Sequence, residues 1–220
     1  MTSVTVCEDS PPAVTRTEIL NRTSENSGLI MEIRVESRSF RDLVVLVPDI
    51  FQDSRGFFME TFREDKFREL GLPHQFVQDN HSRSVKGVVR GLHFQWEPPM
   101  GKLMRVTQGS AFLVAVDIRK GSPTLGKWMG VEASAENRRQ VWAPAGFARG
   151  FCVLSDVAEI QYKCTGIYSN KAESGILWSD PEIGIKWPVP ASQAELSEKD
   201  KKAQTLSEWL ATSQSQNFGY

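Results

Sequence analysis

From residue 43 to about residue 180 the sequence repeats one pattern, in which short runs of β-branched and aromatic residues alternate with turn-forming segments such as SRG, EPPMG and PAG. Many short strands at regular spacing are typical of a β-sandwich or a small barrel. The strand candidates, in chain order, are LVVLVP, GFFMETF, FVQDN, GVVRGLHFQ, KLMRVTQGSAFLVAVDIR, KWMGVEAS, QVWAPAGF, FCVLS and AEIQYKCTG.

Helical patterns are scarce. The segment REDKFREL, residues 63–70, is a short amphipathic candidate. The segment SEKDKKAQTLSEWLA, residues 197–211, predicts one longer helix with Ser197 as its N-cap and an apolar stripe that includes Leu206 and Trp209.

The chain has 220 residues, of which 40% are hydrophobic, and this is enough for one sizeable core. Residues 1–30 are polar and lack periodicity, so they predict a disordered N-terminal tail. We expect a single domain over residues 31–212 and a C-terminal tail over residues 213–220.

Bulk charge and cysteine content narrow the possible partners and compartment. With 26 basic and 27 acidic residues the net charge is -1, which gives no support to nucleic-acid binding. No apolar run is long enough to suggest a membrane span. Cys7, Cys152 and Cys164 are odd in number and have no CxxC spacing, so we expect a reducing, cytoplasmic location.

The chain has three histidines, His74, His81 and His93. The residue two positions after His93 is Gln95, so the HxH pair of many β-sandwich metal sites is absent, which argues against a metal. The GxSxG turn of a serine nucleophile is also absent, and the cysteines at 152 and 164 lie in apolar strands. The remaining function classes are acid–base catalysis and ligand binding without catalysis.

The stretch VVRGLHFQ offers two interpretations for His93. It is either a buried histidine bonded to a neighbour or a base. Strand alternation alone would place Arg90 and His93 on opposite faces, whereas a bulge at Gly91 would bring both onto one face, a pairing that suits an anionic substrate.

Other candidate residues have ordinary explanations when each is taken alone. Asp200 follows Ser197 by three residues, so a carboxylate in the first turn of a helix accounts for it. Tyr162 fits a core aromatic residue. Arg55, Lys102 and other cations fit strand ends.

Taken together, the ordered segments resemble the dTDP-4-dehydrorhamnose 3,5-epimerase family. The resemblance covers roughly residues 41 to 205, in the same order and at nearly the same spacing. The segments that carry it are DSRGFFMETF, FVQDNHSRSVKGVVRGLHFQ, GKLMRVTQGSAFLVAVDIRKGSPTLGKW, AENRRQVWAPAGFARGF, AEIQYKCTGIYS, GILWSDPEIGIKWP and ELSEKD.

This resemblance implies a mainly β, cupin-type jelly roll that forms a homodimer and uses neither a metal nor an organic cofactor. The implied substrate is dTDP-4-dehydro-6-deoxyglucose, which the family inverts at the third and fifth carbons. Such protons lie next to a carbonyl, and a side-chain base can remove them when the enolate oxygen is stabilised.

The resemblance also implies roles for individual residues. His93 is the proton acceptor, Asp200 orients its imidazole, and Tyr162 is the proton donor, since a phenol stays protonated at neutral pH. Tyr168 is expected to stack on the thymine ring. The positions that match other contacts to the nucleotide sugar are Arg55, Glu60, Gln78, Asn80, Arg90, Lys102, Glu173 and Lys199.

Two positions depart from the family pattern, which usually reads FDVAVD and GFAHGF. This chain reads FLVAVD and GFARGF, so Leu113 replaces an aspartate and Arg149 replaces a histidine near the expected pocket. The site becomes more positive, and Arg149 cannot exchange a proton as histidine does. Three alternatives therefore remain open: a single-centre epimerase on a related dTDP-sugar, a ketoisomerase on such a sugar, and a non-catalytic protein that binds a nucleotide sugar.

Overall fold

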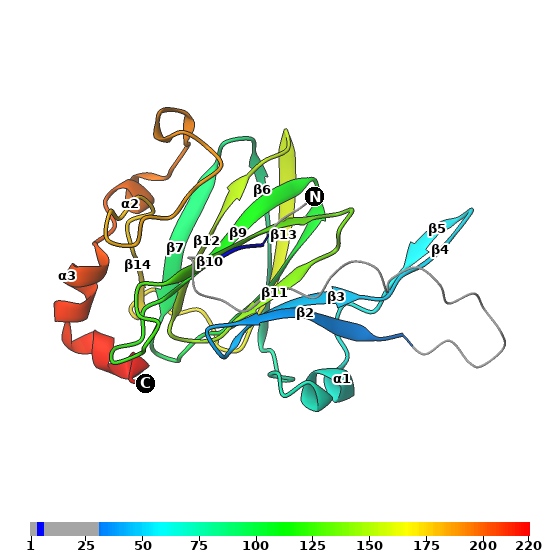
Figure 1. Ribbon diagram of the computed structural model, residues 1–220, viewed down its shortest axis with the longest axis horizontal. Helices are drawn as coiled ribbons and strands as arrows, with labels where there is room; N and C mark the ends of the chain where they lie inside the picture. The colour runs from blue at the N-terminus through cyan, green and yellow to red at the C-terminus, as the bar shows by residue number, and fades with distance from the viewer. Residues whose placement is uncertain (1–3, 7–30) are drawn as a thin grey trace.

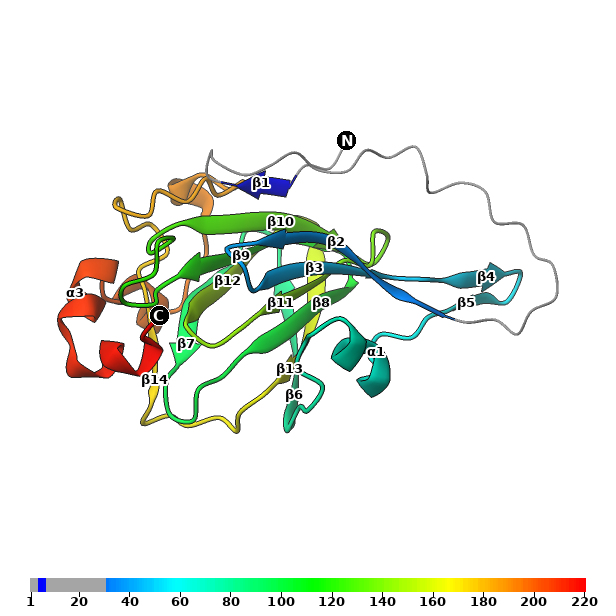
Figure 2. The ribbon, with the colours of Figure 1, turned by 60° about the horizontal axis from the view of Figure 1, so that its bottom comes forward.

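Two facing antiparallel β-sheets dominate the computed structural model, which describes residues 4–6 and 31–220 (Figures 1 and 2). The first sheet has the strand order β1 (Val4–Val6), β10 (Trp128–Ser134), β9 (Ser110–Asp117), β12 (Phe147–Val153), β7 (Val89–Gln95), β14 (Glu173–Gly175). The second has the order β2 (Ile33–Ser39), β3 (Leu43–Pro48), β11 (Gln140–Ala143), β8 (Lys102–Gln108), β13 (Val157–Cys164), β6 (Gln78–Val85). The jelly-roll prediction is confirmed.

The central strands are apolar on both faces because both faces are covered. In β9, Leu113 and Ala115 point into the core between the sheets, whereas Phe112 and Val114 pack under the C-terminal segments. This follows from the alternation of side chains along a strand. The space between the sheets is therefore lined by alternate residues of β7, β8, β12 and β13.

The short helix predicted over 63–70 is confirmed as α1 (Glu64–Glu69). Its buried Phe67 packs edge-to-face on Phe62, with ring centroids 4.9 Å apart, and joins an apolar cluster with Trp142 on the outer face of the second sheet. The remaining short helical element before the C-terminal region is η2 (Ala191–Gln193).

The single helix predicted over 197–211 is wrong, because the segment forms α2 (Glu198–Lys201) and α3 (Leu206–Ala211). Ser197 caps α2 as expected. The chain then leaves the helix so that Gln204 can bridge to the segment after β14, and Thr205 starts α3 with a complete capping box. The capping box in TLSE starts a new helix at Thr205, so the helix that begins at Ser197 does not continue through this segment.

The tails predicted over residues 1–30 and 213–220 stay predictions, and the described residues show one short element at each chain end. β1 pairs with β10, so these three residues lie on the edge of the first sheet, while residues 1–3 and 7–30, including Cys7, lie outside the described residues. At the other end, η3 (Ser213–Phe218) buries Phe218 against Trp209 and Phe94. In the part of the chain that is described, no helix is long and apolar enough to span a bilayer.

The bulge predicted at Gly91 is confirmed. Arg149 pairs with His93 and Phe151 pairs with Arg90, so two steps along β12 correspond to three steps along β7. Gly91 has a φ of +127°. The extra residue lets Leu92 pack outward while the Arg90 guanidinium reaches Ser84 of the opposite sheet. Arg90 and His93 therefore both face the space between the sheets.

A two-stranded hairpin of β4 (Phe51–Asp53) and β5 (Gly56–Phe58) projects from the body of the molecule (Figures 1 and 2). It lies at the far end of the molecule from α2 and α3. Its strand β5 exposes the side chains of Phe57 and Phe58, which are 57% and 65% accessible to solvent.

Candidate active site

His93 and Asp200 form the closest acid–base contact between the sheets. His93 Nε2 lies 2.6 Å from Asp200 Oδ1, and the Asp200 side chain is only 5% exposed. Burial opposes ionisation of Asp200, but the hydrogen bond from His93, assisted by Ser197 and the Gly91 amide, holds its pKa below the usual value. The carboxylate is thus ionised and fixes one nitrogen of the imidazole, leaving Nδ1 free to take a proton.

Tyr162 enters the same space from the opposite sheet. It lies on β13, directly across from Asn80 on β6, and packs against the core between the sheets. Burial raises the pKa of the Tyr162 phenol, although Asn80 and the nearby Arg90 and Arg149 oppose this effect. The phenol is therefore protonated at neutral pH and can act as an acid.

Two cations lie beside the phenol. Lys102 on β8 places its Nζ 5.0 Å from the centre of the Tyr162 ring. Burial, with a smaller contribution from Arg149, lowers the pKa of Lys102 from 10.5 to about 8. Burial also lowers the pKa of Arg149 to about 10, which leaves its guanidinium charged at neutral pH. A ligand bound between the sheets at this point would meet a strongly positive surface.

Polar side chains of β6 and β7 line one side of this space. Gln78 Nε2 donates to Asn80 Oδ1 at 3.0 Å, and Arg90 donates to Ser84 Oγ at 3.1 Å. Arg90 Nη2 also donates to the Arg83 carbonyl. Arg90 nevertheless remains an exposed residue at the edge of the space between the sheets, which is called the rim below. A phosphate group can therefore reach its guanidinium.

A second group of polar side chains lies near α2, where the space between the sheets opens to solvent. Glu173 accepts hydrogen bonds from Lys199 and from the Tyr168 hydroxyl, the latter at 2.8 Å. Together with His93 and Asp200, Glu173 and Lys199 line a cavity of ≈ 280 Å³. Tyr168 is 53% exposed, so one face of its ring is available for stacking.

Arg55 and Glu60 are not brought to this site within one chain. Arg55 lies on the projecting hairpin, its side chain is 88% exposed, and it pairs with Asp53. Glu60 pairs with Arg63 just before α1.

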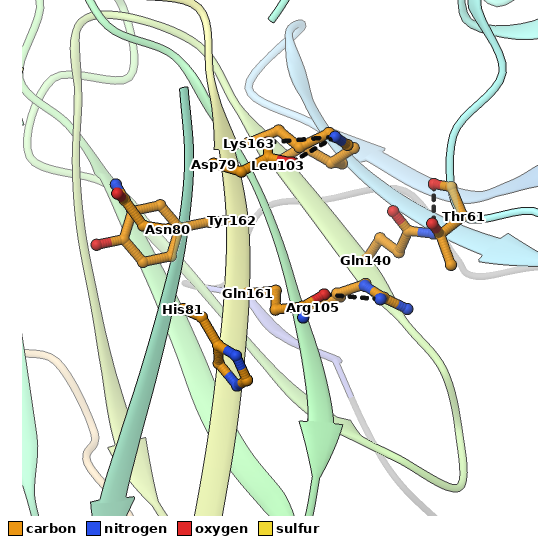
Figure 3. Close-up of a pocket in the computed structure, with 10 residues that line it drawn as sticks. All are labelled: Thr61, Asp79, Asn80, His81, Leu103, Arg105, Gln140, Gln161, Tyr162 and Lys163. Atoms are coloured by element: carbon orange, nitrogen blue, oxygen red, sulfur yellow. Dashed lines mark hydrogen bonds and ion pairs between the residues drawn. The ribbon is translucent and has the colours of Figure 1, made fainter. Parts of the chain in front are cut away.

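The larger cavity, ≈ 340 Å³, opens on the outer face of the second sheet (Figure 3). In Figure 3 the Tyr162 ring and Asn80 point to one side of β6 and β13, and Lys163, Gln161 and Arg105 lie on the other. The Tyr162 ring therefore points away from this cavity, although Tyr162 and Asn80 are both among the residues that line it.

Sequence analysis missed the supporting role of Gln95, which it considered only as a missing metal ligand. Its buried amide donates to the Pro98 and Ile167 carbonyls and accepts from the Ser169 amide. Gln95 thereby anchors the loop that carries Tyr168. Backbone partners of this kind leave no signal in a sequence pattern.

Comparisons with known proteins show which family this chain is similar to. The family model described as dTDP-4-dehydrorhamnose 3,5-epimerase matches residues 37–208. The dTDP-4-dehydrorhamnose 3,5-epimerase of Shigella flexneri is 57% identical over 165 residues, which is 74% of this chain and 90% of that protein.

A crystal structure of dTDP-6-deoxy-D-glucose-3,5-epimerase from Legionella pneumophila Philadelphia 1, in complex with dTDP-4-keto-L-rhamnose, superimposes with a TM-score of 0.79 at 46% identity. The match covers 84% of this chain and 97% of that one. The dTDP-4-dehydrorhamnose 3-epimerase of Streptomyces niveus is 39% identical over 74% of this chain and 79% of that protein.

Proposed function

The chain belongs to the dTDP-4-dehydrorhamnose 3,5-epimerase family, and from this premise we propose that it inverts the third and fifth carbons of dTDP-4-dehydro-6-deoxyglucose to give dTDP-4-dehydrorhamnose. The observation that carries the proposal is that His93, on the first sheet and paired with Asp200 of α2, shares the space between the sheets with the protonated phenol of Tyr162 on the second. A base and an acid on opposite sides of one space are what inversion of a carbon requires.

In the proposed reaction, Nδ1 of His93 removes a proton from a carbon next to the keto group. The ionised Asp200 holds the opposite nitrogen at 2.6 Å and stabilises the imidazolium that forms. The C–H electrons form a carbon–carbon double bond, and the carbonyl pair moves to oxygen as an enolate. Tyr162 then donates a proton to the other face of the same carbon as the enolate electrons return to that carbon and the carbonyl re-forms. The imidazolium of His93 releases its proton to solvent, and the Tyr162 phenolate takes one up from solvent.

The nucleotide part of the substrate would extend toward the rim of the site. Arg90, Gln78 and Asn80 supply donors on one side, and Tyr168 supplies an exposed ring for the base. A guanidinium matches the geometry of phosphate oxygens.

We propose that the enzyme is a homodimer in which the β4–β5 hairpin of one protomer reaches the site of its partner. The strand β5 of this hairpin exposes two phenylalanine side chains, which is unfavourable in water. It also carries Arg55, one of the cations expected to contact the nucleotide sugar, away from its own site. A second copy would satisfy both features at once.

Mixing two inactive variants tests this arrangement. Arg55→Gln and His93→Asn chains, unfolded and refolded together, form mixed dimers. If Arg55 acts on the partner, one of the two sites in a mixed dimer has both residues intact, and activity returns. If Arg55 acts on its own chain, no site is intact and the mixture stays inactive. Light scattering on each variant establishes that dimers are present.

We also place the enzyme in a reducing compartment, the cytoplasm, because Cys152 and Cys164 are free and buried.

Single-centre epimerisation is the second candidate, and the similarity to the Streptomyces niveus 3-epimerase is the observation that favours it. The higher identity to the Shigella flexneri 3,5-epimerase supports double inversion. NMR after incubation with dTDP-4-dehydro-6-deoxyglucose in heavy water decides: we expect deuterium at both carbons. Deuterium at only one carbon would show single epimerisation. Deuterium at neither carbon would indicate a protein that binds the nucleotide sugar without catalysis.

A further inference from the structure

Arg149 is the most buried charge between the sheets. Its side chain comes from β12, the residue is 3% exposed, and its Nη1 donates to the carbonyls of Met100 at 2.8 Å and Ala143 at 3.4 Å. Its Nε and Nη2 are shielded from solvent and have no partner among the described residues. Buried donors without a partner are costly, and the cost is larger for a charged group.

No described acidic side chain forms a hydrogen bond or ion pair with Arg149. Leu113, on the neighbouring strand β9, pairs with Phe151 and is therefore a diagonal neighbour of Arg149 on the same inward face. Where the family usually has aspartate, this chain presents an apolar side chain. After burial, Arg149 makes the largest contribution to lowering the pKa of Lys102.

The position of Arg149 matches the centre of the proposed reaction. It is the direct cross-strand partner of the base His93, and it lies close enough to Tyr162 to influence the pKa of the phenol. A sugar ring held between base and acid would therefore lie against its free N–H groups. Arg90, by contrast, is exposed at the rim, which suits a phosphate.

We propose that Nε and Nη2 of Arg149 bind the oxygen on the fourth carbon of the sugar and stabilise its negative charge in the enolate. This inference rests on the proposed epimerase function and adds a catalytic residue to it. Removal of a proton from the third carbon and removal from the fifth place the charge on this same oxygen. One cation therefore serves both inversions.

Arg149→Gln provides the test, with deuterium wash-in at each carbon measured by NMR and dTDP affinity measured by calorimetry. We expect wash-in at both carbons to fall by the same factor, about 10²–10³, the scale for loss of one oxyanion donor. The dTDP affinity should change less than about threefold, because the proposed binding mode places the nucleotide at the rim near Arg90 and the sugar against Arg149. Arg149→Lys should recover part of the rate. Arg105→Gln, a half-buried arginine on the outer face, serves as the matched control and should leave wash-in unchanged.

A second variant keeps Arg149 and neutralises its field. Leu113→Asp places a carboxylate diagonally across from Arg149, and we expect wash-in to fall at both carbons, whereas Leu113→Asn should have a much smaller effect. This variant decides the matter if Arg149→Gln does not fold.

Three results would overturn the inference: equal wash-in for Arg149→Gln and wild type, a loss confined to one carbon, or a parallel loss of dTDP affinity, which would assign Arg149 to the phosphates. Absence of wash-in in the wild-type enzyme would instead reject the proposed epimerase function.

Discussion

Replacing Lys102 with methionine should stabilise the fold while it removes activity. The amine is charged between the sheets, where burial and the neighbouring Arg149 lower its pKa from 10.5 to about 8. The difference corresponds to roughly 3 kcal/mol of folding free energy at neutral pH. Methionine has a similar length, and it fills the same space without a charge. We expect activity to be lost because the family resemblance assigns Lys102 to a contact with the nucleotide sugar.

The effect should depend on pH in a definite direction. Below about pH 8 the lysine is protonated in both the folded and the unfolded chain, and the full cost applies. Between about pH 8 and 10.5 the unfolded chain binds more protons than the folded one, so wild-type stability rises with pH relative to the variant. The advantage of Lys102→Met should therefore shrink across this range and vanish above it.

Thermal unfolding at pH 7 and at pH 10.5 measures both effects. For a chain of this size 1 kcal/mol shifts the melting temperature by roughly 2–4 °C, so we expect a rise of roughly 6–12 °C at pH 7. Lys86→Met, at an exposed position in the turn after β6, is the control and should change stability by less than about 0.5 kcal/mol. A lower melting temperature for Lys102→Met at pH 7, or a gain that persists unchanged at pH 10.5, would refute the reasoning.

His93→Asn should lower turnover by about 10²–10⁴-fold and abolish deuterium wash-in, whereas Tyr162→Phe should lower product formation more than wash-in; similar small losses from both would reject the acid–base assignment. Asp200→Asn should fall between wild type and His93→Asn in turnover, measured by the same NMR assay, because the imidazole remains but loses its charged partner. Since the pKa of Asp200 is lowered in the folded state, its contribution to stability is present above its unfolded pKa and is lost as pH falls, so acid titration of unfolding should be flatter for Asp200→Asn. Gly91→Ala should destabilise the fold by at least 1–3 kcal/mol in urea unfolding, because the new Cβ would lie 2.6 Å from a backbone atom of β12 and φ is +127°; Gly184→Ala, also at positive φ but 3.8 Å from its nearest contact, should cost less.

The parts of the fold that could be predicted are those governed by local pattern. Alternation and turn residues located the strands, and an amphipathic run located α1. The cap at Ser197 was also visible. The glycine within a strand predicted the bulge that brings Arg90 and His93 to one face, and the register confirms it. Each of these features depends on neighbours within a few residues.

The parts that could not be predicted depend on distant contacts. The capping box in TLSE is a local signal for the start of α3, but the bridge from Gln204 to Ile176, which holds the chain between α2 and α3, has none. The C-terminal residues looked like a polar tail, yet Phe218 completes an aromatic cluster with Trp209. Likewise, the resemblance assigned Arg55 to the substrate, but only the structure shows that its hairpin points away from its own chain's site.

Gly91 links the base, its carboxylate and the buried cation through one close contact. Its backbone amide contributes to holding Asp200 ionised, although that carboxylate comes from α2, far along the chain from His93. On its other side, the missing Cβ lets β7 approach Gly150 of β12, directly after Arg149. A side chain at either glycine would push the strands apart and move the imidazole relative to the guanidinium. The distance between the proton acceptor and the proposed oxyanion site is therefore set by this glycine pair, which means that a substitution there should weaken proton removal and enolate stabilisation together rather than one alone.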